Sequence, residues 1–383
     1  MKNNSKQYKI YILLIAVAAI LWAGKIQYNL PQYANIDLAK YRDMALSSPG
    51  LNLSVPHPYV YRIFAPWLAG IFPVNIDLSF YLLNSLFLIA LACVFFRILS
   101  FHGFDKKLSL LITTAFVFNR YFFQFLAFDY YQLSDTIAYF LLFFSFLLLA
   151  EKRWVFFGIV LTLGILTREA ALLIIPVGYV YLYEKRFDKK DFLQLTLFSF
   201  LAIALFILIR LLIPNPSQEN YLTQIYSGWS SFFSYQALVK RFLIPITPFM
   251  IIPFIFLKDF IEYFKKHYYL ITLFVFVVIS SLFGNDFERL MTAAAPVFYL
   301  FLAYIISKYL NSNLSKSFTA AFYFLVIITV MFSSLYHLWG IIKLPNREIT
   351  MKVTIISDLL MFVLFMVIKY SERIKQPTKQ NNS

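Results

Sequence analysis

Acids and arginines recur at the ends of apolar segments in this chain, and their side chains suit the chemistry of phosphate and hydroxyl groups. The 383 residues are 61% hydrophobic and only 14% charged. Five short runs nevertheless keep acids, arginines or both: "NIDLAKYRDMA" (35–45), "PYVYRIFAPWL" (58–68), "FDYYQLSD" (128–135), "TRE" (167–169) and "GNDFER" (284–289). A charged side chain at bilayer depth costs about 2.5–3.5 kcal/mol, so such residues tend to pair, face a cavity or take part in chemistry. We therefore expect these runs to meet in a catalytic or transport site at one membrane face.

The first run supplies the candidate acids. Asp37 precedes Lys40 and Tyr41 by three and four residues, which places all three on one helix face, whereas Asp43 points elsewhere. An acid in the first turn of a helix also stabilises that helix by about 0.3–1 kcal/mol. Asp37 is therefore either a helix-terminal charge or an acid available to act as a general base, and Asp43 is the alternative acid.

Arginines in two further runs suit phosphate. Arg62 follows Tyr61 among aromatic residues, where a guanidinium group either grips phosphate through two hydrogen bonds or anchors the chain in an aromatic belt. Arg168 and Glu169 have the most apolar surroundings of the charged pairs. They are interpreted either as an ion pair that lowers the cost of burial or as a phosphate-binding arginine supported by its glutamate.

The remaining runs supply supporting groups. Asp129 and Asp135 bracket a short turn, and Asp135 is placed to be the N-cap of the helix that begins "TIAYFLL". Asp286 and Arg289 are three residues apart. They are interpreted either as an ion pair or as a clamp for phosphate. The four histidines are scattered, and no D-x-D, P-loop or G-x-S-x-G motif occurs, so the sequence supports neither a metal site nor a divalent cation as cofactor.

Apolar segments long enough to cross a bilayer must position these residues. A span needs about 20 apolar residues, and the sequence predicts an all-α polytopic membrane bundle of about 12 segments. Residues 154–183 are too long for one upright helix and are interpreted as a hairpin of two short helices with Arg168 and Glu169 at its tip. Residues 8–24 are interpreted as a retained signal-anchor. The other expected spans are 76–98, 108–126, 135–150, 192–213, 242–257, 268–283, 290–307, 317–340 and 350–369.

The distribution of basic residues predicts the orientation of the bundle. The net charge of +15 lies mostly in short loops, which is typical of the cytoplasmic side of a membrane protein and argues against a nucleic-acid partner. Both termini are then cytoplasmic, and the charged runs face outward from the plasma (inner) membrane. One domain, 1–370, carries two long outer loops, 25–75 and 214–241, and ends in a polar tail, 371–383. In the first loop 36–46 is expected to be an interfacial helix, and 59–72 a short apolar piece broken by Pro66.

The pattern of these runs resembles the polytopic glycosyltransferases of the GT-C class, which take sugars from polyprenyl-phosphate donors. The likeness is carried by "DLAKYRDMA", "YRIFAPWLAG", "TREAALLIIP" and "NDFERLMTAAAP", and it covers residues 30–300. It departs from the class in one respect, because Asp37 is followed by Leu38 and Ala39 instead of a second acid.

The resemblance implies an inverting enzyme with a catalytic acid in the first outer loop. Asp37 matches that position and would be the general base. Arg62, Arg168 and Arg289 would hold the donor phosphate, and Tyr226, Trp229 and Tyr235 would stack on the acceptor. The partners expected are the bilayer, a polyprenyl-phosphate-linked sugar, and a glycan, lipid or protein acceptor. A transporter or flippase of an anionic lipid or solute, and a polysaccharide polymerase or ligase, are the alternatives.

Overall fold

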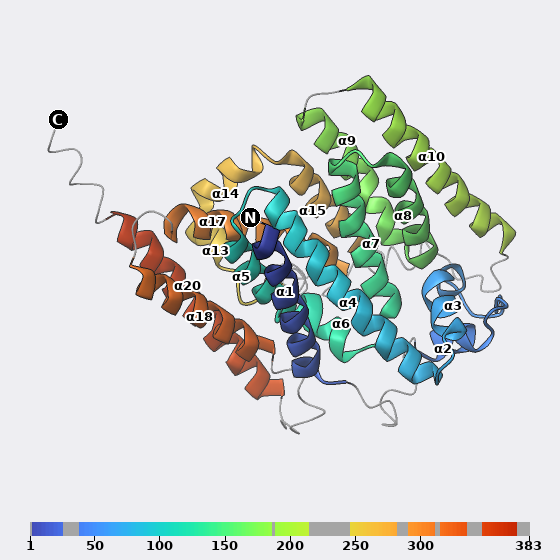
Figure 1. Ribbon diagram of the computed structural model, residues 1–383, viewed down its shortest axis with the longest axis horizontal. Coiled ribbons are helices and arrows are strands. Elements are labelled where there is room, and N and C mark those ends of the chain that lie inside the picture. The colour runs from blue at the N-terminus through green and yellow to red at the C-terminus, as the bar shows by residue number, and fades with distance from the viewer. Residues whose placement is uncertain are drawn as a thin grey trace.

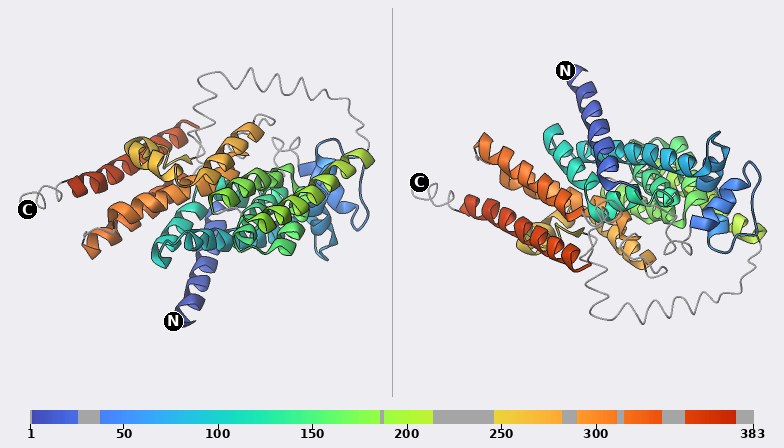
Figure 2. Two further views of the ribbon diagram at one scale, coloured as in Figure 1. Left: turned by 90° about the horizontal axis from the view of Figure 1, so that it is seen from above. Right: turned by 90° about the horizontal axis from the view of Figure 1, so that it is seen from below.

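The computed structural model describes residues 2–25, 38–185, 188–213, 246–281, 290–310, 315–334 and 347–373. Within these ranges the chain is a helical bundle without β-strands, which confirms an all-α polytopic membrane protein (Figure 1). α18 and α20 pack together at one margin of the bundle, and α10 forms the opposite margin (Figures 1 and 2). The largest buried side chains are aromatic, among them Phe95, Phe116 and Tyr299.

The described helices are named here in chain order. They are α1 (Lys2–Ala23), α2 (Leu38–Leu46), α3 (Phe64–Ile71), α4 (Ile76–Phe101), α5 (Lys106–Val117), α6 (Phe125–Phe128), α7 (Leu133–Ala150), α8 (Trp154–Thr167), α9 (Ile174–Glu184), α10 (Lys189–Leu212), α13 (Ile252–Ile255), α14 (Leu257–Phe264), α15 (Tyr268–Ser281), α17 (Ala295–Leu310), α18 (Lys316–Ser333) and α20 (Arg347–Arg373). Short helical pieces join several of them: the 3-10 helices η2 (Tyr59–Tyr61), η4 (Glu169–Leu173) and η6 (Met291–Ala294), and the π-helix η3 (Arg120–Gln124).

The described helices that are long and apolar enough to span a membrane number six, or up to eight if each of two bent pairs is one span. The count of twelve is therefore not confirmed. Two further apolar helices, Gln7–Ala23 and Trp154–Thr167, are shorter than these candidate spans. The expected span 242–257 is wrong over its described part, because residues 246–256 form turns and the four-residue helix α13.

The expected span 108–126 is a broken helix, bent by 64° between Lys106–Val117 and Phe122–Phe128. Asn119 lies at the break. Its side-chain Nδ2 donates to the carbonyl of Thr247 (2.9 Å), and its Oδ1 accepts from the backbone N–H of Phe122 (3.1 Å). A polar side chain that satisfies backbone groups offers the chain an alternative to the regular helix, and hydropathy alone does not reveal it.

The expected hairpin is present. Arg168 interrupts it with an extended backbone (φ −168°, ψ 145°) between α8 and η4. At the start of α8, Lys152 pairs with Asp191 in the first turn of α10 (2.5 Å). At the tip, Glu169 reaches Arg210 in the last turn of α10 (2.8 Å). α8 thus runs alongside α10, and α9 returns, which places Arg168 and Glu169 at one end of the bundle.

The expected outer-loop helix is present as α2, directly after Asp37. The break expected at Pro66 is absent, because Pro66 lies in the first turn of α3. Backbone N–H groups in the first turn have no partner within the helix, so proline is tolerated there. α3 packs closely on α2: a Cβ on Gly70 would lie 2.0 Å from the carbonyl oxygen of Ala45.

Contacts along the helices define two ends of the bundle. Tyr8 near the start of α1 stacks on Phe96 and lies beneath Lys106, whereas Lys25 after α1 lies over Tyr81. The end that holds Lys106, Lys152 and the start of α10 is called the basic end below. The end that holds Arg62, Glu169 and Arg210 is called the cluster end.

Candidate functional site

Glu169 accepts hydrogen bonds from two arginines at the cluster end. Arg62 Nη2 lies 3.5 Å from Glu169 Oε2, and Arg210 Nη2 lies 2.8 Å from Glu169 Oε1. Arg62 also donates through Nη1 to the hydroxyl of Tyr41 (3.0 Å). Tyr41, Arg62, Glu169 and Arg210 are called the arginine–glutamate cluster below. It joins α2, the first outer loop, the hairpin tip and the end of α10.

Short local structures aim Arg62 at Glu169. Arg62 directly follows η2 and is its C-cap, and its backbone N–H donates to the carbonyl of Tyr59 (2.8 Å). The guanidinium carbon of Arg62 lies 5.8 Å from the centre of the Tyr59 ring, and Tyr59 in turn meets Tyr41 edge-on at 5.4 Å. Aromatic faces attract cations at such distances, so the tyrosines of this loop fix the arginine instead of only marking a membrane boundary.

Arg210 completes the cluster and is absent from the sequence-based candidates. Its guanidinium carbon lies 4.3 Å from the Phe206 ring centre and 4.7 Å from that of Tyr61. Tyr61 is buried and therefore belongs to the wall that holds Arg210. The available signal was a lone arginine in the last turn of a long apolar helix, which is costly unless it faces a partner.

The cluster carries an excess of positive charge, with two guanidinium groups around one carboxylate. Burial opposes the charge of Arg62, but Tyr41 and Glu169 outweigh it and raise the arginine's pKa above its usual value. Burial likewise opposes the charge of Glu169, and Arg62 and Arg210 outweigh it and hold the pKa of that carboxyl below its usual value. Arg62 and Glu169 are therefore both charged at neutral pH.

Two donors of the cluster have no acceptor. The Nε atoms of Arg62 and Arg210 are buried and lack a hydrogen-bond partner among the described residues. A buried N–H left unpaired costs about 1–3 kcal/mol. An oxyanion bound beside the two guanidinium groups would remove that cost.

Arg168 forms an ion pair with Asp135. Both side chains are almost fully buried, at 6% and 2% exposed. Asp135 lies in the first turn of α7, but the N-cap residue is Gln132, so the expected N-cap role of Asp135 is wrong. The alternative in which Arg168 is an ion-paired buried charge fits this arrangement better than a phosphate ligand facing an open site.

The other described candidates lie apart from the cluster. Asp129 is buried and accepts from Gln132 Nε2 (3.2 Å). Asp43 is exposed on α2 and belongs to no ion pair of the described residues. A further group of polar contacts at this end was not expected. Asp77 accepts a hydrogen bond from the hydroxyl of Tyr131, and its carboxylate lies 3.7 Å from the guanidinium group of Arg42.

Several candidates lie outside the described residues. They are Asp37, Asp286, Arg289, Tyr226, Trp229 and Tyr235. Their parts in the site remain predictions.

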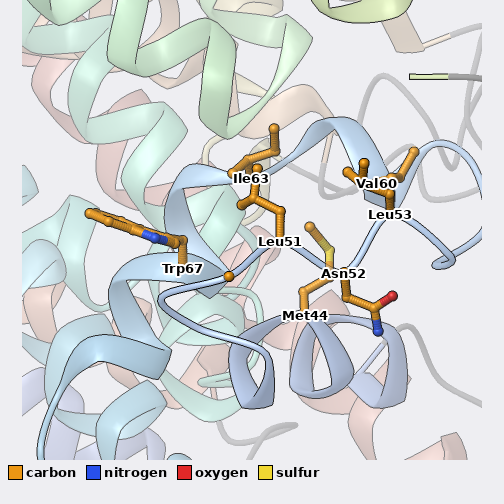
Figure 3. Close-up of a pocket in the computed structure, with 8 residues that line it drawn as sticks. Met44, Leu51, Asn52, Leu53, Val60, Ile63 and Trp67 are labelled. Carbon is orange, nitrogen blue, oxygen red and sulfur yellow. The ribbon is translucent and has the colours of Figure 1, made fainter. Parts of the chain in front are cut away.

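A small apolar hollow lies beside the cluster, between α2 and α3 (Figure 3). Its volume is about 240 Å³, including open solvent. Its wall includes Met44 of α2, Leu51, Val60 and Trp67, and Asn52 is its polar member (Figure 3). Among the described residues no group of three or more His, Cys, Asp or Glu side chains is arranged to hold a metal ion.

Comparison with known families settles the class of the chain. The model of the family described as "Predicted membrane protein (DUF2079)" matches residues 41–380. The chain belongs to this family. The matched range includes Tyr41, Arg62, Glu169 and Arg210, and it begins four residues after Asp37. No curated protein and no solved structure matches the chain.

Proposed function

We propose that the protein is an integral-membrane glycosyltransferase that moves a sugar from a polyprenyl-phosphate donor to an acceptor hydroxyl. One observation carries the proposal: Arg62 and Arg210, from distant parts of the chain, meet at Glu169 and keep a net positive charge at one end of an apolar bundle. Arginine is suited to phosphate because its planar fork matches two phosphate oxygens. A donor whose tail lies in the bilayer presents its phosphate at the membrane surface, which is where this end of the bundle would lie.

In the proposed reaction the arginines stabilise the leaving group. Asp37 takes the proton from the acceptor hydroxyl, whose oxygen attacks the anomeric carbon with inversion. The bond between that carbon and the phosphate oxygen breaks, and the negative charge that develops on the phosphate is offset by Arg62 and Arg210, with Arg289 as a further ligand. Glu169 pairs with both arginines and orients them.

The other predicted residues have auxiliary roles in the proposed reaction. Arg168 and Asp135 fix the hairpin tip behind Glu169. Tyr226, Trp229 and Tyr235 stack on the acceptor sugar. The reaction takes place at the non-cytoplasmic face of the plasma (inner) membrane, since the basic loops gather at the other end of the bundle.

The direct test is transfer by the purified protein in detergent or nanodiscs. A panel of labelled polyprenyl-phosphate sugars is supplied with glycan, lipid and peptide acceptors, and product is separated from donor. We expect transfer by the wild type and a loss of about 100-fold or more in Arg62→Ala, Arg210→Ala and Asp37→Asn. Arg97→Ala is the matched control, because Arg97 also pairs with a glutamate, Glu151, but at the basic end.

Full activity of Arg62→Ala and Arg210→Ala would contradict the assigned roles. Transfer of a complete oligosaccharide instead of one sugar would identify a polymerase or ligase.

A transporter or flippase of an anionic lipid is the second candidate, favoured by the helix broken at Asn119, since transporters bind substrates at broken helices. It predicts movement of the intact lipid across proteoliposomes without cleavage of the donor.

A further inference from the structure

A second polar cavity lies at the basic end, far from the arginine–glutamate cluster. It has a volume of about 510 Å³, including open solvent, and its lining contains His102, Glu262, Tyr263, Lys266, His267 and Tyr304. His102 follows α4, whose first turn holds Asp77 at the cluster end. At 1.5 Å per residue the two residues are about 38 Å apart along α4, so this cavity is separate from the proposed active site.

The cavity opens where headgroups of a bilayer would lie. α14 forms part of its wall and is bent by 101° from α15, so α14 runs across the end of the bundle instead of along it. Its exposed side chains are apolar on one side (Leu257, Ile261) and charged on the other (Lys258, Glu262). A helix of this kind rests in the membrane interface.

The charges around the cavity favour an anion. Lys266 and Glu262 line it, and Lys185 lies close enough to His267 to lower the pKa of that imidazole. Glu262 lies 4.0 Å from Lys258, and Glu184 accepts from the backbone N–H of Tyr269 (3.1 Å). Lys266 is exposed and has no ion pair among the described residues.

The two histidines play different parts. His102 is fully engaged: Nδ1 donates to the carbonyl of Ile98 (2.8 Å), and Nε2 therefore accepts from the hydroxyl of Tyr269 (2.5 Å). In contrast, Nδ1 of His267 is buried and has no hydrogen-bond partner among the described residues. Burial, with Lys185 and Lys266 nearby, lowers the pKa of His267 to about 4, so its ring is neutral at pH 7 and offers one N–H donor.

We propose that this cavity binds the phosphate group of an anionic membrane phospholipid, with Lys266 as the counter-ion and His267 as the hydrogen-bond donor. The aromatic wall of Phe104, Tyr263 and Tyr304 suits the region between headgroup and acyl chain, where such side chains gather in membrane proteins. Basic pockets between helices are a recognised means of binding anionic headgroups. The inference does not rest on the proposed glycosyltransferase activity.

Native mass spectrometry of the detergent-purified full chain tests the proposal. The probes are phosphatidylglycerol and phosphatidylcholine with identical acyl chains. We expect phosphatidylglycerol to bind more tightly, and Lys266→Ala and His267→Gln to weaken it by about tenfold each. Lys266→Arg should retain binding, and Lys316→Ala, an exposed lysine at the basic end outside the cavity, should leave it unchanged.

Three outcomes would overturn the proposal. They are equal binding of the two lipids, unchanged binding in both Lys266→Ala and His267→Gln, and displacement of phosphatidylglycerol by equimolar inorganic phosphate, which would assign the cavity to free phosphate. Retained binding in Lys266→Arg, with an unchanged melting temperature, separates loss of the site from loss of the fold.

Discussion

At the scale of single residues, Glu169 is the group that lets Arg62 and Arg210 approach each other. Replacing it by glutamine keeps the shape but leaves two partly buried guanidinium groups, 13% and 28% exposed, without a counter-charge. We expect Glu169→Gln to lower the free energy of unfolding by about 1–3 kcal/mol, read as a fall in melting temperature in detergent.

A second glutamate provides the control for this change. Glu151 also accepts from two arginines, Arg97 and Arg153, but these are 54% and 58% exposed, and exposed ion pairs contribute about 0–1 kcal/mol. Glu151→Gln should melt close to the wild type. Equal losses of stability in the two variants would show that the arginine–glutamate cluster stabilises the fold no more than an exposed ion pair does.

The lowered pKa of Glu169 predicts how this contribution depends on pH. An acid whose pKa is lower in the folded state stabilises the fold above its unfolded pKa of about 4.3, and this stabilisation is lost as pH falls through the lower folded value. The stability difference between wild type and Glu169→Gln should therefore be constant from about pH 6 to 7 and shrink below about pH 4. Parallel melting curves at all pH values would contradict the ion-paired state of Glu169.

Arg168 and Asp135 form the most buried ion pair described here, so their contributions should be strongly coupled. Removing one partner leaves a buried charge, and we expect Asp135→Asn and Arg168→Gln each to cost about 3–5 kcal/mol. The double variant should cost less than the sum of the two, which a double-mutant cycle measures. Additive losses would mean that the two side chains are satisfied by other groups.

At the scale of elements, the sequence predicted those features that depend on local composition. The helix after Asp37 and the hairpin with Arg168 and Glu169 at its tip were both expected, because amphipathic spacing and a charged interruption of an apolar run are local signals. The partners of Glu169 were not expected. Arg210 and Arg62 are 41 and 107 residues away from it, and only the packing of α8 on α10 and of the first outer loop on the tip brings them together.

The packing of α3 on α2 sets the distance between Arg62 and Tyr41. Gly70→Ala would place a Cβ 2.0 Å from the Ala45 carbonyl oxygen and 2.4 Å from Ser48 Oγ, so α3 must move away from α2. We expect a loss of about 1–3 kcal/mol in stability, together with weaker donor binding. Ile71→Ala is the control, since Ile71 is the next residue and is 45% exposed. An unchanged melting temperature and unchanged donor binding in Gly70→Ala would mean that the two helices separate without moving Arg62.

At the scale of the whole molecule, the proposed function depends on the separation of the two ends of the bundle. The arginine–glutamate cluster and the hydrogen bond between Tyr131 and Asp77 lie at one end, and most of the basic residues that flank the helices lie at the other. The lipid-phosphate cavity proposed for the basic end would then sit in the opposite leaflet from the proposed active site. This arrangement brings together helix ends that are far apart in the sequence. Hydropathy predicted the membrane class, and the number of spans stays a prediction.

The orientation of the two ends is open to direct measurement. The positive-inside rule places the basic end in the cytoplasm. In a Cys93→Ser background, which removes the single native cysteine on the surface of α4, Asp43→Cys marks the cluster end and Lys316→Cys the basic end, and both positions are exposed. A membrane-impermeant maleimide added to intact cells should label Cys at position 43 and reach position 316 only after permeabilisation. The reverse pattern would put the arginine–glutamate cluster in the cytoplasm, where a donor and an acceptor of the outer face could not reach it.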